Sequence, residues 1–273
     1  MSEANNVAWP AAAAVFDRLA PGYDELFTRS VIGRAMRDQV WERLRRAFTS
    51  GDRILELNCG TGEDALYLSR RGMSVVACDA SPGMIEVADK RRSLEACESN
   101  VEFHLLANED LSALQALAPF DGAFSNFSGL NCLAHLQPLA HDLGILVKPG
   151  GRVLLCLSSR VCIGEWIWFL VHGQGEKAFR RVSGKAIARF DDLTISVSYP
   201  TVSQMKAAFA PWFRLETRRA IGLFVPPSYV ENWMRAHRRT FSFLRNLDRA
   251  FAKWPLLRDA GDHVLLEFER CRN

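Results

Sequence analysis

A glycine-rich turn with acidic residues around it is the part of this sequence best suited to hold a cofactor. The run Gly60-Thr61-Gly62-Glu63-Asp64-Ala65 fits the pattern G-x-G-x-x-[GA] and lies between a strand-like apolar run and a helical pattern. Asp79 ends the next apolar run, at a spacing from which a carboxylate can accept the hydroxyls of a ribose. Taken alone, this arrangement predicts a dinucleotide site for NAD or FAD.

Two further features favour S-adenosylmethionine (SAM) over a dinucleotide. Long helical patterns precede the first strand, whereas a dinucleotide-binding domain usually begins at that strand. An acid, Glu56, stands before the turn, and SAM carries a sulfonium cation and an amino-acid zwitterion instead of a pyrophosphate. Gly60 and Gly62 let the backbone approach the methionyl group because no Cβ intervenes. The alternative interpretation is a plain tight turn in which Asp79 caps a helix.

Strands and helices alternate through the middle of the chain, which predicts an α/β fold with a parallel sheet wound on both faces. The expected strands are 53–58, 74–79, 101–106, 120–126 and 151–158, with helices at 63–71, 82–97 and 131–147 between them. Helices are expected before them at 11–20 and 24–48. After residue 158 we expect one or two helices over 160–189, a strand at 193–199, a helix at 203–210, a strand at 213–220, a helical stretch at 226–254 and a strand at 263–270.

Several segments resemble the class I SAM-dependent methyltransferases found in quinone and other small-molecule biosynthesis. They are Phe16-Asp-Arg-Leu-Ala-Pro-Gly-Tyr-Asp24, Leu55-Glu-Leu-Asn-Cys-Gly-Thr-Gly62, Val75-Val-Ala-Cys-Asp-Ala-Ser-Pro-Gly-Met84, Val101-Glu-Phe103 and Leu146-Val-Lys-Pro-Gly-Gly151. The resemblance implies a Rossmann-like seven-stranded, mostly parallel sheet with an antiparallel last strand. It also implies SAM as cofactor, S-adenosylhomocysteine as its product, and 213–220 and 263–270 as the sixth and seventh strands.

The resemblance divides the chain into four parts and assigns roles to single residues. Residues 1–50 would be a helical segment closing over SAM, 51–158 the SAM-binding core, 159–202 a cap insertion with helical and aromatic character, and 203–273 the strands and helices that complete the sheet. Tyr23 would lie near the sulfonium, with Arg34 or Arg37 on the methionyl carboxylate. Asn58 replaces a usual glycine, and Asn108 stands where such enzymes place an acid on adenine. The expected cofactor-binding set is Tyr23, Arg34, Glu56, Asn58, Gly60, Gly62, Asp79, Ala80, Met84, Asn108 and Asn126.

The methyl acceptor is expected beyond the carboxyl ends of the strands. We expect a small, apolar or aromatic acceptor that reacts at an O, N or C atom, under a lid formed by residues 160–199. The lid interpretation rests on Trp166, Trp168 and Phe169, which would otherwise simply pack on the sheet. His135, His141 and His172 are candidate bases, but the sequence assigns no catalytic residue. Asn131 is expected to cap the helix that follows it.

Composition limits the remaining classes of function. The chain has 273 residues and a formal net charge of +3, too small to indicate nucleic acid as a partner. No apolar run approaches the roughly 20 residues that cross a bilayer, and residues 1–10 lack the pattern of a signal peptide, so a cytoplasmic protein is expected. Seven cysteines without a C-x-x-C pair argue against a zinc site or a disulfide framework. Two alternatives stay open: an RNA- or lipid-surface-acting methyltransferase that uses the arginine-rich segment 214–258, or a SAM- or NAD-binding protein without transferase activity.

Overall fold

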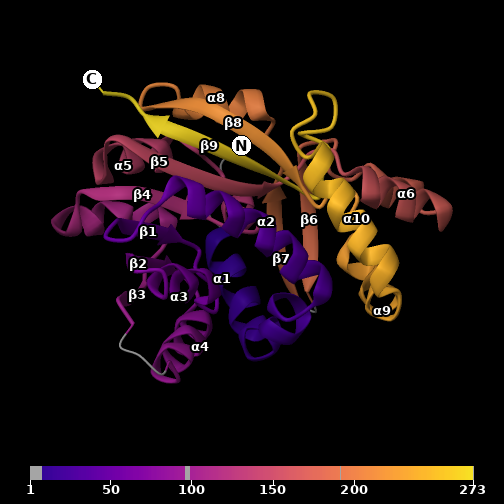
Figure 1. Ribbon diagram of the computed structural model, residues 1–273, viewed down its shortest axis with the longest axis horizontal. Coiled ribbons are helices and arrows are strands. Elements are labelled where there is room, and N and C mark those ends of the chain that lie inside the picture. Colours follow the sequence, from indigo (N-terminus) through magenta and orange to yellow (C-terminus); the bar gives the residue numbers. More distant parts are fainter. Residues whose placement is uncertain (1–7, 96–98, 191, 273) are drawn as a thin grey trace.

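A seven-stranded sheet forms the centre of the molecule, in the order β3-β2-β1-β4-β5-β9-β8 (Figure 1). The computed structural model describes residues 8–95, 99–190 and 192–272, so Cys97 and residues 1–7 lie outside it. The strands are β1 (Arg53–Leu57), β2 (Ser74–Asp79), β3 (Val101–Leu105), β4 (Phe120–Ser125), β5 (Val147–Ser158), β8 (Phe213–Ile221) and β9 (His263–Arg270). Strands β1 to β5 run parallel, and β9 lies antiparallel between β5 and β8. The expected mostly parallel sheet with an antiparallel last strand is confirmed.

The two faces of the sheet are covered by different helices because side chains alternate along each strand. On one face Leu55 and Leu57 pack with α5 (Gln137–Leu146), α8 (Val202–Phe209) and the 3-10 segment η3 (Asn108–Leu117). On the other face Ile54 packs with α2 (Val31–Ala47) and α3 (Glu63–Ser69), and α4 (Pro82–Ser93) lies against β3. The same alternation turns Glu56 toward the face of α2 and α3, so that this strand carries a carboxylate into the interior.

The N-terminal helices differ from the two helices expected. Helix α1 (Ala8–Leu19) is followed by η1 (Ala20–Gly22) and a π-helical turn, η2 (Asp24–Thr28), before α2 begins at Val31. The helical conformation is interrupted at Ser30, which has an extended backbone. Ser30 caps α2, because its Oγ accepts a hydrogen bond from the Gly33 N–H at 2.9 Å. The helix expected over 24–48 is therefore two helices joined at a cap.

The segment after β5 is a short helical pair followed by a hairpin. It comprises α6 (Ile163–Val171), α7 (Gly175–Ala178), β6 (Lys185–Phe190) and β7 (Leu193–Ser198). The expectation of helix through residue 189 is wrong for 185–189, because this stretch pairs with β7 as an antiparallel strand. Ile195 of β7 packs on Ala12 and Val15, so the hairpin rests on α1.

A buried carboxylate fixes the C-terminal helices to the sheet. The helical stretch expected over 226–254 is divided into η5 (Ser228–Val230), α9 (Glu231–Ala236) and α10 (Arg238–Phe251). Asp248 of α10 is fully buried and accepts from Gln39 Nε2 at 2.6 Å, the Phe224 N–H at 2.6 Å and the Gly222 N–H at 3.2 Å. One side chain thus connects α10 with α2 and with the turn that follows β8.

We expect Asp248→Ala to lower the free energy of unfolding by about 3 kcal/mol, because three donors lose a charged acceptor inside the protein. Asp38→Ala on α2 is the matched control. Asp38 is partly exposed, and its ion pair with Arg34 is long, at 4.0 Å. Its loss should therefore lower the free energy of unfolding by less than about 1 kcal/mol. Urea unfolding of both variants measures the difference, and equal losses would contradict the connecting role of Asp248.

Candidate functional site

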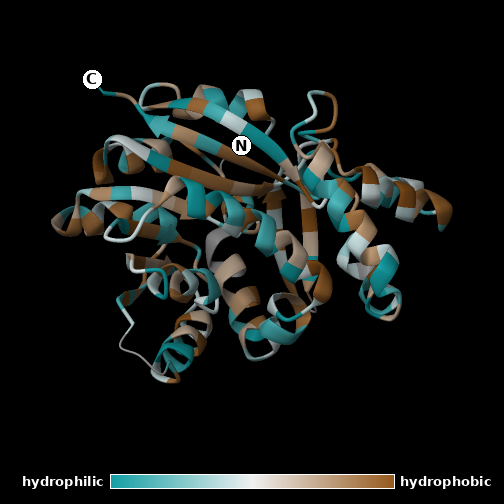
Figure 2. Cartoon of the chain, in the orientation of Figure 1, coloured by the Kyte–Doolittle hydropathy of each residue, from teal (hydrophilic) through white to brown (hydrophobic). Residues whose placement is uncertain are grey.

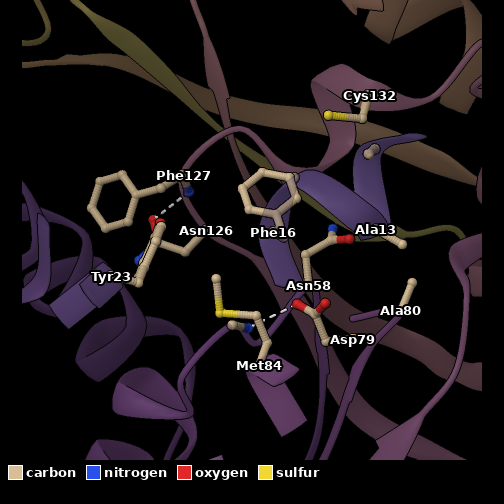
Figure 3. A pocket seen from close by; sticks show the side chains of 13 residues that line it. Ala13, Phe16, Tyr23, Asn58, Asp79, Ala80, Met84, Asn126, Phe127 and Cys132 are labelled. Carbon is tan, nitrogen blue, oxygen red and sulfur yellow. Dashed lines mark hydrogen bonds between the residues drawn. The ribbon is translucent and has the colours of Figure 1, made fainter. Parts of the chain in front are cut away.

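A cavity opens beyond the carboxyl ends of β1, β2 and β4 (Figure 3). Residues from the N-terminal helices and from the loops after these strands line it: Ala12, Ala13, Phe16, Tyr23, Asn58, Gly60, Asp79, Ala80, Met84, Asn126, Phe127, Gly129 and Cys132. The structure therefore brings together Tyr23, Asn58, Gly60, Asp79, Ala80, Met84 and Asn126 from the expected set. Glu56, Gly62, Asn108 and Arg34 do not line the cavity.

The two glycines of the turn serve different purposes. Both have left-handed backbones, with φ of 53° at Gly60 and 74° at Gly62. A Cβ at Gly60 would meet nothing within 4 Å, because this residue borders the cavity. A Cβ at Gly62 would lie 2.7 Å from Phe103 Cζ. Gly60 thus leaves room for a ligand, whereas Gly62 lets the start of α3 pack against β3.

Asp79 joins the end of β2 to the glycine turn. Its Oδ2 accepts from the Gly60 N–H and its Oδ1 from the Ser81 N–H, each at 2.9 Å. Burial raises the pKa of this carboxyl, although the backbone donors act in the opposite direction. A carboxylate has about four lone-pair sites, so both oxygens can accept further hydrogen bonds from a ligand in the cavity.

Asn108 reaches the cavity only through Asn58. Asn108 Nδ2 donates to Asn58 Oδ1 at 2.7 Å, and Asn58 Nδ2 donates to Ser125 Oγ at 3.1 Å. These bonds hold Asn58 in a left-handed conformation with φ of 54°. Asn108, expected beside adenine, is therefore a buried support for a residue of the cavity wall.

Arg37, rather than Arg34, lies close to the cavity. Arg37 is buried, pairs with Asp64 and lies with its guanidinium carbon 5.0 Å from the centre of the Phe127 ring. Arg34 is half exposed and pairs with Glu63 at 2.8 Å, outside the cavity. Of the two arginines considered for a methionyl carboxylate, the structure places only Arg37 behind the cavity wall.

Glu56 lies beneath the turn as a buried and incompletely paired acid. Its Oε2 has no hydrogen-bond partner among the described residues. Burial and the neighbouring Asp64 carboxylate hold the pKa of Glu56 well above its usual range, while Arg37 acts to lower it. The site thus contains more acidic side chains than the single nearby guanidinium, that of Arg37, can pair with.

Two aspartates of the N-terminal segment close it over the cavity, a function that the sequence did not indicate. Asp17 of α1 accepts from the Gly83 N–H at 2.9 Å and from the Ser81 hydroxyl at the start of α4. Asp24 accepts from Thr61 Oγ1 at 2.7 Å and pairs with Arg91. Phe16 and Tyr23 directly precede these two aspartates, and their rings form one wall of the cavity (Figure 3).

His263 supports the opposite wall and was also missed. It begins β9, is buried, and lies with Nε2 2.9 Å from Ser128 Oγ and its ring 5.4 Å from that of Phe127. Burial lowers its pKa. Phe127 and Ser128 have left-handed backbones, with φ of 46° and 70°, which is unusual outside glycine. Only the folded arrangement of β4 and β9 reveals this contact.

Several expectations for the acceptor side are corrected. Trp166, Trp168 and Phe169 of α6 do not line the cavity; Trp166 packs on Phe179 and Trp168 on His172. The lid expectation fails for α6 because the helix lies against the Leu223–Pro227 segment instead. The candidate bases His135, His141 and His172 also lie outside the cavity.

Asn131 is not a helix cap. Its Nδ2 donates to the Ser198 carbonyl at 2.6 Å, and its Oδ1 accepts from the Ser158 N–H at 2.9 Å. It therefore connects the ends of β5 and β7. In the part of the chain that the structure describes, no cluster of His, Cys, Asp or Glu could hold a metal ion, and the cysteines are free.

Comparison with known proteins agrees with this geometry. Residues 54–151 match the family model described as a methyltransferase domain. The demethylmenaquinone methyltransferase of Clavibacter sepedonicus is 34% identical over 154 residues, which cover 54% of this chain and 58% of that protein. The match thus spans somewhat more than half the length of this relative.

Solved structures share the fold at low identity. A SAM-dependent methyltransferase from Mesorhizobium loti has a TM-score of 0.53 at 14% identity and covers 84% of this chain and 97% of its own. The DhpI complex with S-adenosylhomocysteine has a TM-score of 0.54 at 15% identity and covers 97% of each chain. The domain match includes β1, β2 and the turn between them, so residues 54–151 are similar to a methyltransferase domain, and the solved structures share the fold of the chain.

Proposed function

We propose that this chain transfers the methyl group of SAM to a small acceptor molecule. The observation that carries the proposal is a cavity with two unlike sides. Asp79, Asn58 and the open backbone of Gly60 form a polar side suited to a ribose and an amino acid. Phe16, Phe127 and Tyr23 form an aromatic side that faces it (Figure 3).

The cofactor is proposed to lie along the polar side. Asp79 accepts the two ribose hydroxyls with the lone pairs that Gly60 and Ser81 leave free. Arg37, which is held behind Phe127, would offer a positive charge to the methionyl carboxylate. The aromatic rings of the lining would attract the sulfonium, because their faces attract a cation.

Methyl transfer is a single in-line displacement. A bond forms between the acceptor atom and the methyl carbon while the carbon–sulfur bond breaks, and its electron pair stays on sulfur as S-adenosylhomocysteine. The acceptor loses a proton. The protein aligns the reactants and excludes water, for which the closed N-terminal segment is suited.

The titratable side chains of the lining favour an acceptor that is itself acidic. Burial raises the pKa of Tyr23 and raises the pKa of Cys132 to about 11, so both side chains stay protonated near neutral pH and neither is available to accept the proton of the acceptor. Asp79 is engaged by the turn. We therefore propose a phenol, enol or quinol type of acceptor, which ionises readily. The likeness to demethylmenaquinone methyltransferases, whose name gives a quinone-related acceptor, supports this class.

Isothermal calorimetry with SAM, S-adenosylhomocysteine and NAD, followed by radiolabelled methyl transfer to aromatic quinols and naphthols, tests the function. Tight SAM binding and methylation of a quinol would support the proposal. SAM binding without transfer to any of a broad set of acceptors would favour a non-catalytic SAM-binding protein. Preference for NAD would overturn the cofactor assignment.

Asp79→Ala should weaken SAM binding tenfold or more, about 1.4 kcal/mol, because the ribose loses charge-assisted hydrogen bonds. Asp52→Ala is the control. Asp52 also accepts a backbone N–H, from Thr49 at 2.7 Å, but lies at the other end of β1. Calorimetry of both variants is the measurement, and unchanged affinity in a folded Asp79→Ala protein would refute the ribose contact.

Gly60→Val should abolish SAM binding while most of the fold persists, because the new side chain enters the cavity. Gly173→Val is the control that distinguishes backbone strain from obstruction of the cavity. Gly173 has a φ of 69° and open surroundings but lies outside the cavity, so its variant carries similar backbone strain and should bind SAM normally. If both variants bind SAM like the unaltered protein, Gly60 does not border the cofactor.

Arg37→Met should weaken binding of SAM but leave binding of 5′-methylthioadenosine, which has no methionyl carboxylate, nearly unchanged. Arg34→Met should alter neither affinity, because Arg34 lies outside the cavity. Since Arg37→Met leaves the buried Asp64 unpaired, Arg37→Lys provides a second variant that keeps the charge. Equal loss of both ligands in a folded variant, or an effect confined to Arg34, would contradict the assignment.

A further inference from the structure

Helix α6 presents an apolar face to solvent. Its sequence, Ile163-Gly-Glu-Trp-Ile-Trp-Phe-Leu-Val171, contains one charged residue. Ile167, Leu170 and Val171 are one turn apart and are 60%, 52% and 78% exposed. Figure 2 shows the hydrophobic outer end of this helix, which projects from the molecule beside α9 and α10. Monomeric proteins seldom leave such a face in water without a partner.

A buried ion cluster fixes the orientation of this face. The one acid of α6, Glu165, points inward and pairs with Arg180 and with Arg181, and Arg181 also pairs with Asp262 at 2.9 Å. Glu165 is fully buried. Because the charged side of the helix is held inside, the apolar side is held outside.

An apolar groove extends this face toward α10. Ile163, Gly164, Ile167 and Trp168 of α6 form one side, and Leu244 of α10, Leu257 and the Leu223–Pro227 segment form much of the other. Beyond the groove, Phe243 is 61% exposed, and Trp254 and Leu256 in the loop after α10 are 51% and 84% exposed. The apolar surface therefore spans two neighbouring projections of the chain (Figure 1).

The helices on the far side of the groove carry a strong positive charge. Residues 231–258 contain seven basic residues, Arg235, Arg238, Arg239, Arg245, Arg249, Lys253 and Arg258, and two acidic residues, Asp248 and Glu231, of which Glu231 pairs with Arg235. Asp248 is buried and bound to the backbone after β8, so it does not neutralise the surface. Among the described residues, no acid pairs with the exposed Arg238, Arg239 or Arg249.

We propose that the end of the molecule formed by α6, α9 and α10 docks on an anionic phospholipid bilayer. The exposed side chains of α6 enter the interfacial region, and the α10 arginines contact lipid phosphates. Among the described residues no helix is long and apolar enough to cross a membrane, so this is attachment to the surface. A protein partner would cover the apolar face equally well, but the concentration of unpaired arginines beside it favours a surface of many phosphates.

Vesicle flotation with the full chain tests the proposal. We expect the protein to float with vesicles of phosphatidylcholine mixed with phosphatidylglycerol, and to remain behind with phosphatidylcholine alone. Arg238→Glu/Arg239→Glu should weaken binding by more than about tenfold, since each basic residue near an anionic surface contributes on the order of a factor of five. Leu170→Ser/Val171→Ser should also release the protein.

Two matched control variants carry the same kinds of substitution on another part of the surface. Arg71→Glu/Lys90→Glu and Leu94→Ser/Leu105→Ser alter exposed residues of α3, α4, β3 and their connections, and both should bind vesicles normally. Equal binding to neutral vesicles, loss of binding in the controls, or no flotation at all would overturn the proposal. So would a concentration-dependent dimer that only the α6 variant dissociates, which would identify a second copy as the occupant.

The docking surface contains no residue of the cavity. SAM affinity, measured by calorimetry, should therefore stay unchanged in all four double variants. This readout separates the two proposals, because failure of vesicle binding leaves the cofactor site intact, and failure of SAM binding leaves the surface intact.

Discussion

The carboxylate of Asp64 is the contact on which the arrangement of the cavity depends. It lies at the start of α3, in the first turn after the glycine loop, and accepts from Arg37, from Trp41 Nε1 at 2.5 Å and from Asn126 Nδ2 at 2.9 Å. These donors come from α2 and from the end of β4. A single buried anion thus joins the N-terminal segment, the cofactor turn and the far wall, which are distant in sequence. Removing it would leave a buried guanidinium without its partner, a costly state in a protein interior.

The same region contains more acidic than basic side chains. Glu56 and Asp64 are buried near Arg37, Asp79 is partly buried at the cavity, and burial raises the pKa of both Glu56 and Asp79. The proposed cofactor brings two positive charges, on sulfonium and ammonium, and one carboxylate. Its charges therefore complement those of the site: the carboxylate fits the single guanidinium, and the cations fit the acids. A pyrophosphate carries only negative charge, so these acidic side chains would repel it.

Sequence reasoning predicted the core well because local signals and sheet topology agree there. The strand, turn, helix and acid around Gly60 and Asp79 form a continuous segment, and the alternation of strands and helices allows few topologies. It failed where contacts link distant segments. Nothing local to His263 indicates that β9 brings it to Ser128, and nothing local to α6 says which side of the molecule the helix covers. The hairpin at 185–198 was half missed because its first strand carries alanines that suit a helix equally well.

The non-glycine residues with left-handed backbones explain where the fold departs from local preference. Among the described residues these are Asn58, Phe127 and Ser128, and the first two line the cavity. Such conformations cost on the order of 1–3 kcal/mol each and persist only when their surroundings hold them. Asn58 is held by Asn108 and Ser125, and Ser128 lies within hydrogen-bonding distance of both Ser158 and His263. Asparagine tolerates this conformation better than most residues, so Asn58 can adopt it without being glycine. The strain is therefore confined to the two loops that shape the cavity, and the residues that stabilise it come from η3, β4, β5 and β9. A ligand site whose walls are fixed in this way is formed before the ligand arrives, since the sheet itself supplies the supporting side chains.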